Sequence, residues 1–132
     1  MPLSGPAGYA FNRTRQSYLA TQLSVADTHW SRFMGLMGKD SADFSGGQGL
    51  WITPSHGVHT FAMRFPIDVI YLDGRKIIVH LEKRLKPWRM APVRMGAASV
   101  IELPEHTLDQ TGTAVGDEIE IAMGQPRETN AS

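Results

Sequence analysis

Alternating apolar and polar positions mark the clearest element of the chain, a β-hairpin in its middle. Two runs rich in β-branched residues, 67–72 and 76–81, flank the dipeptide Asp73-Gly74. Such a pair predicts a tight turn, because both residues tolerate positive φ. Alternation along the first run places Asp68 on the same face as two aliphatic residues. We therefore expect this carboxylate to meet an apolar layer.

The same periodicities predict further strands and two helical segments. The other strand-like runs are residues 16–25, 50–53, 99–103 and 115–121. Apolar residues at i, i+3, i+4 and i+7 form one helical stripe, namely Trp30, Phe33, Met34 and Met37. Asp27 or Thr28 can cap the start of this helix, and Gly38 can end it in the left-handed conformation. Residues 104–112 predict a short helical turn, and residues 54–66, bounded by prolines, predict an irregular segment.

These elements predict a mainly β, α+β domain. We expect a compact bent sheet or small β-barrel with one N-terminal helix and one short helical turn. Pro, Gly and small polar residues at both ends predict flexible tails, residues 1–12 and 124–132, around a single domain of residues 13–123. A chain of 132 residues that is 42% apolar has the size and composition to form one core.

Charge and cysteine content narrow the function classes. Thirteen basic residues balance thirteen acidic ones, which argues against nonspecific nucleic-acid binding and against tethering to an anionic membrane. The absence of cysteine removes disulfides, thiolate metal ligands and cysteine nucleophiles, and it suits a reducing compartment. No apolar run approaches the ~20 residues that span a bilayer, and no signal-peptide pattern opens the chain. We therefore expect a cytoplasmic monomer with no cofactor, no nucleic-acid partner and no membrane partner.

Four polar side chains crowd into an otherwise apolar stretch of ten residues: His59, Thr60, Arg64 and Asp68. His59 and Asp68 can act as a general base and its orienting carboxylate, with Thr60 or Ser55 as the nucleophile. The same residues can instead form a buried hydrogen-bonded network that fixes the loop. Because no nucleophile signature is present, the network is the default interpretation.

His56 and His59 are three residues apart, a spacing at which two imidazoles can bind the same metal ion. Zinc usually needs three or four protein ligands, and the sequence brings no further ligand near. We therefore predict no metal site and interpret the two residues as loop histidines, one of them hydrogen-bonded.

Arg64 lies between two bulky apolar residues, where a guanidinium requires a partner. Asp68 or Glu102 can supply that partner inside the fold. Alternatively, Arg64 and Arg32 can form a fork for a carboxylate or phosphate on a ligand. Glu102 lies within the strand-like run 99–103, and a buried carboxylate there also requires a partner.

Bulky side chains near these polar residues are typical both of a core and of an aromatic-rimmed pocket. We assign Trp88 to a pocket rim and Phe65 to the core. The charged run 82–89 predicts a solvated loop, because local basicity without a global excess seldom holds nucleic acid.

Five sequence blocks occur in a fixed order along the chain. They are RFMGLMGK (32–39), GLWITP (49–54), HTFAMRFPIDVIYLD (59–73), VIELP (100–104) and GDEIEI (116–121). Together they resemble the bacterial and archaeal family catalogued as domain of unknown function 192, over about residues 24–121. The resemblance implies a compact β-barrel-like domain with a helix near the N-terminus, and it implies no particular reaction.

The resemblance also bears on three details. Related sequences often carry a cysteine where this chain has Ser55, and many resemble forms with an N-terminal signal that this chain does not show. The last block is also similar to the Gly-Asp turns of cradle-loop barrels. That similarity implies that Asp117 caps a loop, which is ordinary chemistry for Asp beside Gly.

The leading hypothesis is therefore a non-catalytic binder of a small polar or anionic ligand, or of an extended peptide. The expected ligand-binding residues are Arg32, His59, Arg64, Asp68, Trp88 and Glu102. One alternative is a hydrolase-like enzyme that uses His59 and Asp68. The other is a protein–protein interaction module with an exposed sheet edge.

Overall fold

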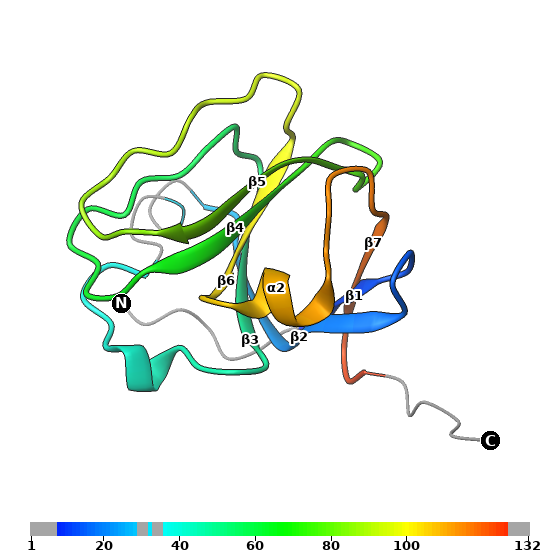
Figure 1. Ribbon diagram of the computed structural model, residues 1–132, viewed down its shortest axis with the longest axis horizontal. Helices are drawn as coiled ribbons and strands as arrows, with labels where there is room; N and C mark the ends of the chain where they lie inside the picture. The colour runs from blue at the N-terminus through cyan, green and yellow to red at the C-terminus, as the bar shows by residue number, and fades with distance from the viewer. Residues whose placement is uncertain (1–7, 29–31, 33–35, 127–132) are drawn as a thin grey trace.

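A single seven-stranded sheet forms the protein in a computed structural model, which describes residues 8–28, 32 and 36–126 (Figure 1). The strands lie in the order β5-β4-β6-β3-β2-β1-β7. Their bounds are β1 Gly8–Asn12, β2 Ser17–Ala26, β3 Gln48–Ile52, β4 Ile67–Leu72, β5 Ile78–Leu85, β6 Ser99–Pro104 and β7 Ile119–Met123. A 3₁₀ turn, η1 (Ser41–Asp43), and a short helix, α2 (Thr107–Thr111), complete the described elements. Only β2 and β3 pair in parallel, and the other ladders are antiparallel.

The sheet curls until its two edges approach each other. An antiparallel bridge joins Ile77 to Glu118, and the backbone N–H of Ile78 donates to the carbonyl of Asp117 at 3.0 Å. These contacts lie at one end of β5 and β7, so the sheet forms a half-barrel. The expectation of a mainly β domain built on a bent sheet is confirmed.

Two apolar layers cover the two faces of the sheet. The inner layer fills the curl and draws residues from both edges, such as Ile78 and Ile119, together with Leu108 of α2. The outer layer lies between β3, β4 and β6 and the irregular segments that cross them. All six residues of β4 are buried, because the strand contributes to both layers.

The hairpin between β4 and β5 has a longer connection than the sequence predicts. Leu72 pairs with Ile78, so residues 73–77 form the turn, and the positive φ of 63° falls at Lys76. The Asp73 carboxylate accepts the N–H groups of Arg75 and Ile77 at 2.9 Å each. An Asx-type turn therefore replaces the predicted tight Asp-Gly turn.

The N-terminal part of the chain differs from the sequence prediction. Residues 8–12 form β1, between β2 and β7, so the predicted N-terminal tail does not extend to residue 12. Gly8 is required there, because a Cβ at this position would overlap the carbonyl oxygen of Ala122.

The predicted N-terminal helix lies mostly outside the described residues. Gly38, its predicted end, has a φ of 77°. Within the described part of the chain, no helix has the length and apolar character needed to cross a bilayer.

Asp117 has the loop-capping role that was expected of it. Its carboxylate accepts hydrogen bonds from the Asn12 side chain at 2.9 Å, from Arg15 Nε at 3.0 Å and from the Ala114 N–H at 3.0 Å. The carboxylate thus ties the turn before β7 to the end of β1.

Asp68 is buried on the inner face of β4, as its alternation predicts. It is 1% exposed, and its two oxygens accept the N–H groups of Arg84 and Leu108 at 2.9 Å each. One bond holds β5 at Arg84, where φ is 51°, and the other caps the first turn of α2. Asp68 is therefore a structural acceptor between two elements.

We predict that Asp68→Asn lowers the free energy of unfolding by about 1–2 kcal/mol and that Asp68→Ala lowers it by about 2–4 kcal/mol. Asn keeps one acceptor, whereas Ala leaves both buried N–H groups unpaired. Urea unfolding measures both values. The exposed Asp43 supplies a control, since Asp43→Ala should change stability by less than about 0.5 kcal/mol. Equal stability of Asp68→Ala and the wild type would contradict the structural role.

Candidate functional site

Two irregular segments, far apart in sequence, lie against each other over the outer face of the sheet. Residues 53–66 connect β3 to β4, and residues 86–98, here called the strap, connect β5 to β6. Their backbones exchange hydrogen bonds from Ser55 N–H to the Ala98 carbonyl, from Ala91 N–H to Val58 and from Arg94 N–H to His56, all 2.9 Å. The irregular loop predicted between the two prolines is thus held by a second loop.

Thr60 is the point where this pairing is tightest. The residue is fully buried, its N–H donates to the Arg89 carbonyl at 2.8 Å, and its own carbonyl accepts the Trp88 N–H at 2.8 Å. The hydroxyl donates to the Lys86 carbonyl at 2.6 Å and accepts the Arg89 N–H at 2.8 Å. These bonds occupy the hydroxyl, so Thr60 serves as a clamp and has no geometry for nucleophilic attack.

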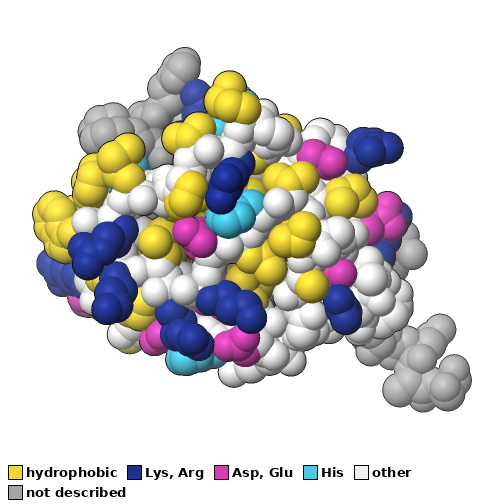
Figure 2. Space-filling view, turned by 45° about the horizontal axis from the view of Figure 1, so that its top comes forward, with side chains coloured by type: hydrophobic (Ala, Val, Ile, Leu, Met, Phe, Trp, Pro, Cys, Tyr) yellow, Lys and Arg dark blue, Asp and Glu magenta, His cyan; other side chains and the backbone are white. Residues whose placement is uncertain are grey.

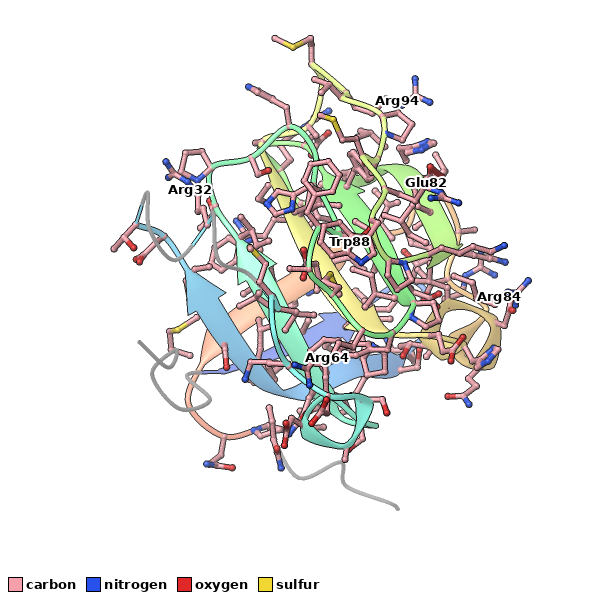
Figure 3. All side chains as sticks on the ribbon, turned by 90° about the vertical axis from the view of Figure 1, so that its left-hand side faces the viewer. Arg32, Arg64, Glu82, Arg84, Trp88 and Arg94 are labelled. Carbon is pink, nitrogen blue, oxygen red and sulfur yellow. The ribbon has the colours of Figure 1, made fainter. Side chains whose placement is uncertain are left out.

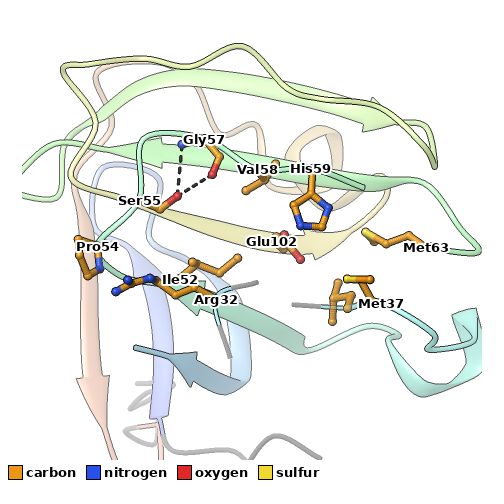
Figure 4. A pocket seen from close by; sticks show the side chains of 11 residues that line it. Arg32, Met37, Ile52, Pro54, Ser55, Gly57, Val58, His59, Met63 and Glu102 are labelled. Atoms are coloured by element: carbon orange, nitrogen blue, oxygen red, sulfur yellow. Dashed lines mark hydrogen bonds between the residues drawn. The ribbon is translucent and has the colours of Figure 1, made fainter. Parts of the chain in front are cut away.

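A pocket of about 100 Å³ opens beside this clamp, between the 53–66 segment and the sheet (Figure 4). Its polar lining residues are Arg32, Ser55, His59 and Glu102. Its apolar lining residues include Leu36, Met37, Ile52, Val58 and Met63. The pocket therefore joins three of the six predicted ligand-binding residues, namely Arg32, His59 and Glu102.

Glu102 is the most unusual of the three. It lies in the middle of β6, opposite Leu50 of β3 and Val69 of β4, and it is 2% exposed. Its Oε2 has no hydrogen-bond partner among the residues that the structure describes. Burial raises the pKa of the Glu102 carboxyl to about 8, so the group is predominantly protonated at neutral pH. Figure 4 shows this carboxyl in the middle of the pocket.

His59 stands half-buried at the same pocket. Its Nδ1 accepts the N–H of Phe61 at 3.2 Å, which places the proton of the neutral ring on Nε2. The imidazole also stacks on Phe61, with 5.2 Å between ring centroids. Local backbone geometry therefore fixes the orientation of the ring.

The other three predicted ligand-binding residues lie outside this pocket. Arg64 is 64% exposed and pairs with Asp40 at 2.8 Å, so the hypothesis that Asp68 or Glu102 is its internal partner is wrong. Asp68 lies on the opposite face of the sheet, toward α2. Trp88 is 64% exposed on the strap, with its ring centroid 6.3 Å from that of Phe61. Figure 3 shows Arg32, Arg64 and Trp88 well separated over this side of the molecule.

The predicted catalytic arrangement is not formed. Both carboxylate oxygens of Asp68 accept hydrogen bonds from backbone N–H groups, so Asp68 does not orient His59. The Ser55 hydroxyl donates to the carbonyl of Gly57 at 2.6 Å, which ties it into its own turn. His56 bonds the Ala97 carbonyl through Nδ1 at 2.6 Å. Among the residues with described positions, no group of three His, Cys, Asp or Glu side chains converges as a metal site would require.

Comparison with known proteins places the chain in a family. Residues 10–121 match the family DUF192, described as "Uncharacterized ACR, COG1430". The chain belongs to the DUF192 family. A UPF0127 protein of Thermococcus sibiricus is 33% identical over 121 residues, covering 88% of this chain and 76% of that protein. The UPF0127 protein PF1050 of Pyrococcus furiosus is 30% identical over 114 residues, covering 83% and 94% of the two chains.

One solved structure shows that the DUF192 fold seen here recurs. A protein of unknown function from Novosphingobium aromaticivorans aligns with a TM-score of 0.74 at 16% identity. The alignment covers 91% of this chain and 89% of that one. The half-barrel fold is thus shared.

We predict that Thr60→Val lowers the free energy of unfolding by about 1–3 kcal/mol. Valine keeps the shape of threonine but removes the hydroxyl, and the buried Arg89 N–H loses an acceptor. Thr60→Ser keeps the hydroxyl and serves as the matched control. Thermal unfolding measures the stability, and amide exchange at Arg89 measures the local opening. Wild-type stability and Arg89 protection in the valine variant would show that the hydroxyl is no clamp.

A second prediction concerns pH. The Glu102 carboxyl has a pKa of about 8 when folded against 4.5 as its ordinary value, so the folded state binds more protons between these limits. Its contribution to stability is complete below about pH 4.5 and is lost as the pH rises through about 8. Relative to Glu102→Gln, the wild type should lose on the order of 3–5 kcal/mol over that interval. Urea unfolding at a series of pH values measures this, with Glu118→Gln as an exposed control. A constant difference across the interval would mean that Glu102 titrates normally.

Proposed function

We propose that the pocket at Glu102 binds a small polar or anionic ligand without performing chemistry on it. The observation that supports this most strongly is the Glu102 carboxyl, which is buried in the pocket and lacks a partner for Oε2 among the described residues. An unpaired buried polar atom costs about 1–3 kcal/mol, and an acceptor atom on a ligand would offset that cost.

The protonation state of Glu102 selects the ligand chemistry. A neutral carboxyl donates one hydrogen bond, so it favours an acceptor such as a carboxylate, carbonyl or hydroxyl oxygen. Arg32 also lines the pocket and adds positive charge to its wall, which favours an anionic group. His59 lines the same pocket.

The dimensions and lining of the pocket limit the size of the ligand. A volume of about 100 Å³ corresponds to roughly three water molecules at liquid density. It suits an organic acid of a few heavy atoms, or the carboxylate end of a peptide. The apolar side chains of Val58, Met37 and Met63 would contact the carbon part of such a ligand.

The geometry supports binding better than it supports hydrolysis. The hydroxyls of Thr60 and Ser55 are engaged by backbone groups, and Asp68 is on the other side of the sheet. An acyl-transfer mechanism requires a nucleophile hydrogen-bonded to its base, and the two hydroxyls donate to backbone carbonyls instead.

Ligand-observed NMR with formate, acetate, propionate and glycolate tests the proposal. Wild-type protein should bind at least one of these acids below pH 8 and lose about tenfold in affinity for each further pH unit, because ionised Glu102 repels an anion. Glu102→Gln keeps a donor and should remove this pH dependence, whereas Glu118→Gln should behave as wild type. No binding by any acid, or equal pH dependence in Glu102→Gln, would contradict the proposal.

A further inference from the structure

The strap and the parts of β5 and β6 next to it are locally basic, although the net charge of the whole chain is zero. Residues 83–101 contain five Lys or Arg residues and no Asp or Glu, although the whole chain has thirteen of each sign. Asp109 pairs with two of these cations, Lys83 and Arg84. The remaining three, Lys86, Arg89 and Arg94, are exposed and form no ion pair with any residue whose position is described.

Large apolar side chains project from the same segment. Along the strap, Trp88 is 64% exposed, Met90 71%, Val93 61% and Met95 76%, and the neighbouring Phe61 is 39% exposed. Elsewhere in the described chain only Val79, Val115 and Met123 are comparably exposed. Figure 2 shows apolar side chains along the upper and left rim of this face, interspersed with cationic ones. Such a concentration is typical of an interaction surface.

The strap holds these side chains outward on a fixed backbone. Ala91 and Ala97 of the strap are themselves buried, and the Tyr71 hydroxyl donates to the Pro92 carbonyl at 2.8 Å. The Thr60 clamp holds the strap near Trp88 and Arg89. The exposed apolar side chains therefore cannot turn into the core without breaking this anchoring.

We propose that the strap is a peripheral docking surface for an anionic lipid bilayer. Trp and Met side chains between Lys and Arg suit the membrane interface, since the rings and thioethers enter the acyl boundary while the cations meet lipid phosphates. The expectation of no membrane partner rested on the zero net charge and on the lack of a run long enough to span a bilayer. The local separation of charge removes the first objection, and the second does not apply to a protein that binds at the bilayer surface.

Co-sedimentation with vesicles tests this proposal independently of the pocket. At low salt the full chain should sediment with vesicles of equal parts phosphatidylglycerol and phosphatidylcholine, and not with phosphatidylcholine alone. Salt should weaken the binding, because the attraction to phosphate is screened. Absence of binding to the anionic vesicles would overturn the proposal.

Two variants and a matched control locate the surface. Arg89→Glu/Arg94→Glu and Met90→Ser/Met95→Ser should each lower the partition coefficient tenfold or more. Val115→Ser/Met123→Ser removes two exposed apolar side chains that are not part of the strap, and it should leave the partition coefficient unchanged. Thermal unfolding confirms that each variant is folded. Unchanged binding by both strap variants would overturn the proposal. So would a strap-dependent dimer in solution, or binding of poly-glutamate in preference to the vesicles.

Discussion

The buried clamp at Thr60 is the interaction on which both candidate surfaces depend. Residues 53–66 and the strap lack regular secondary structure, so neither segment supplies hydrogen-bond partners for all of its own backbone N–H and carbonyl groups. Thr60 satisfies four of these hydrogen-bonding positions with one residue, from both its backbone and its hydroxyl. Its neighbour His59 faces the pocket, while Phe61 lies toward Trp88 on the strap. One small polar residue thus positions both the pocket wall and the exposed side chains of the strap.

Glu102 gives the pocket its chemical character. Strand β6, between β4 and β3, places the carboxyl of Glu102 among apolar side chains of the outer layer, where ionisation is costly. A hydrophobic residue of similar size at this position would avoid the cost of burying a carboxyl. Buried ionisable groups with strongly shifted pKa values are typical of functional sites. The proposed ligand would reduce the cost of burying the Glu102 carboxyl, because an acceptor atom of the ligand would form a hydrogen bond with it.

Local patterns predicted much of the sheet and some of the site. Alternation placed Asp68 against the inner layer and Glu102 inside a strand, and the resemblance implied the capping role of Asp117. The sequence predictions were wrong at positions whose structure depends on partners that lie far away along the chain. Gly8–Asn12 looks like a tail because its partners β2 and β7 lie far away in sequence. The partner of Arg64 is Asp40, in a loop that periodicity does not place, and the role of Thr60 requires the strap beside it.

The central claim is that Glu102 is held neutral in a pocket of the folded protein. The most direct test is a pH titration of glutamate side-chain carboxyl carbons by ¹³C NMR, with Glu102→Gln identifying the resonance. The account predicts a midpoint near 8, well separated from the exposed glutamates. A midpoint near 4.5, the ordinary value, would show that the carboxyl is ionised at neutral pH and would contradict the account.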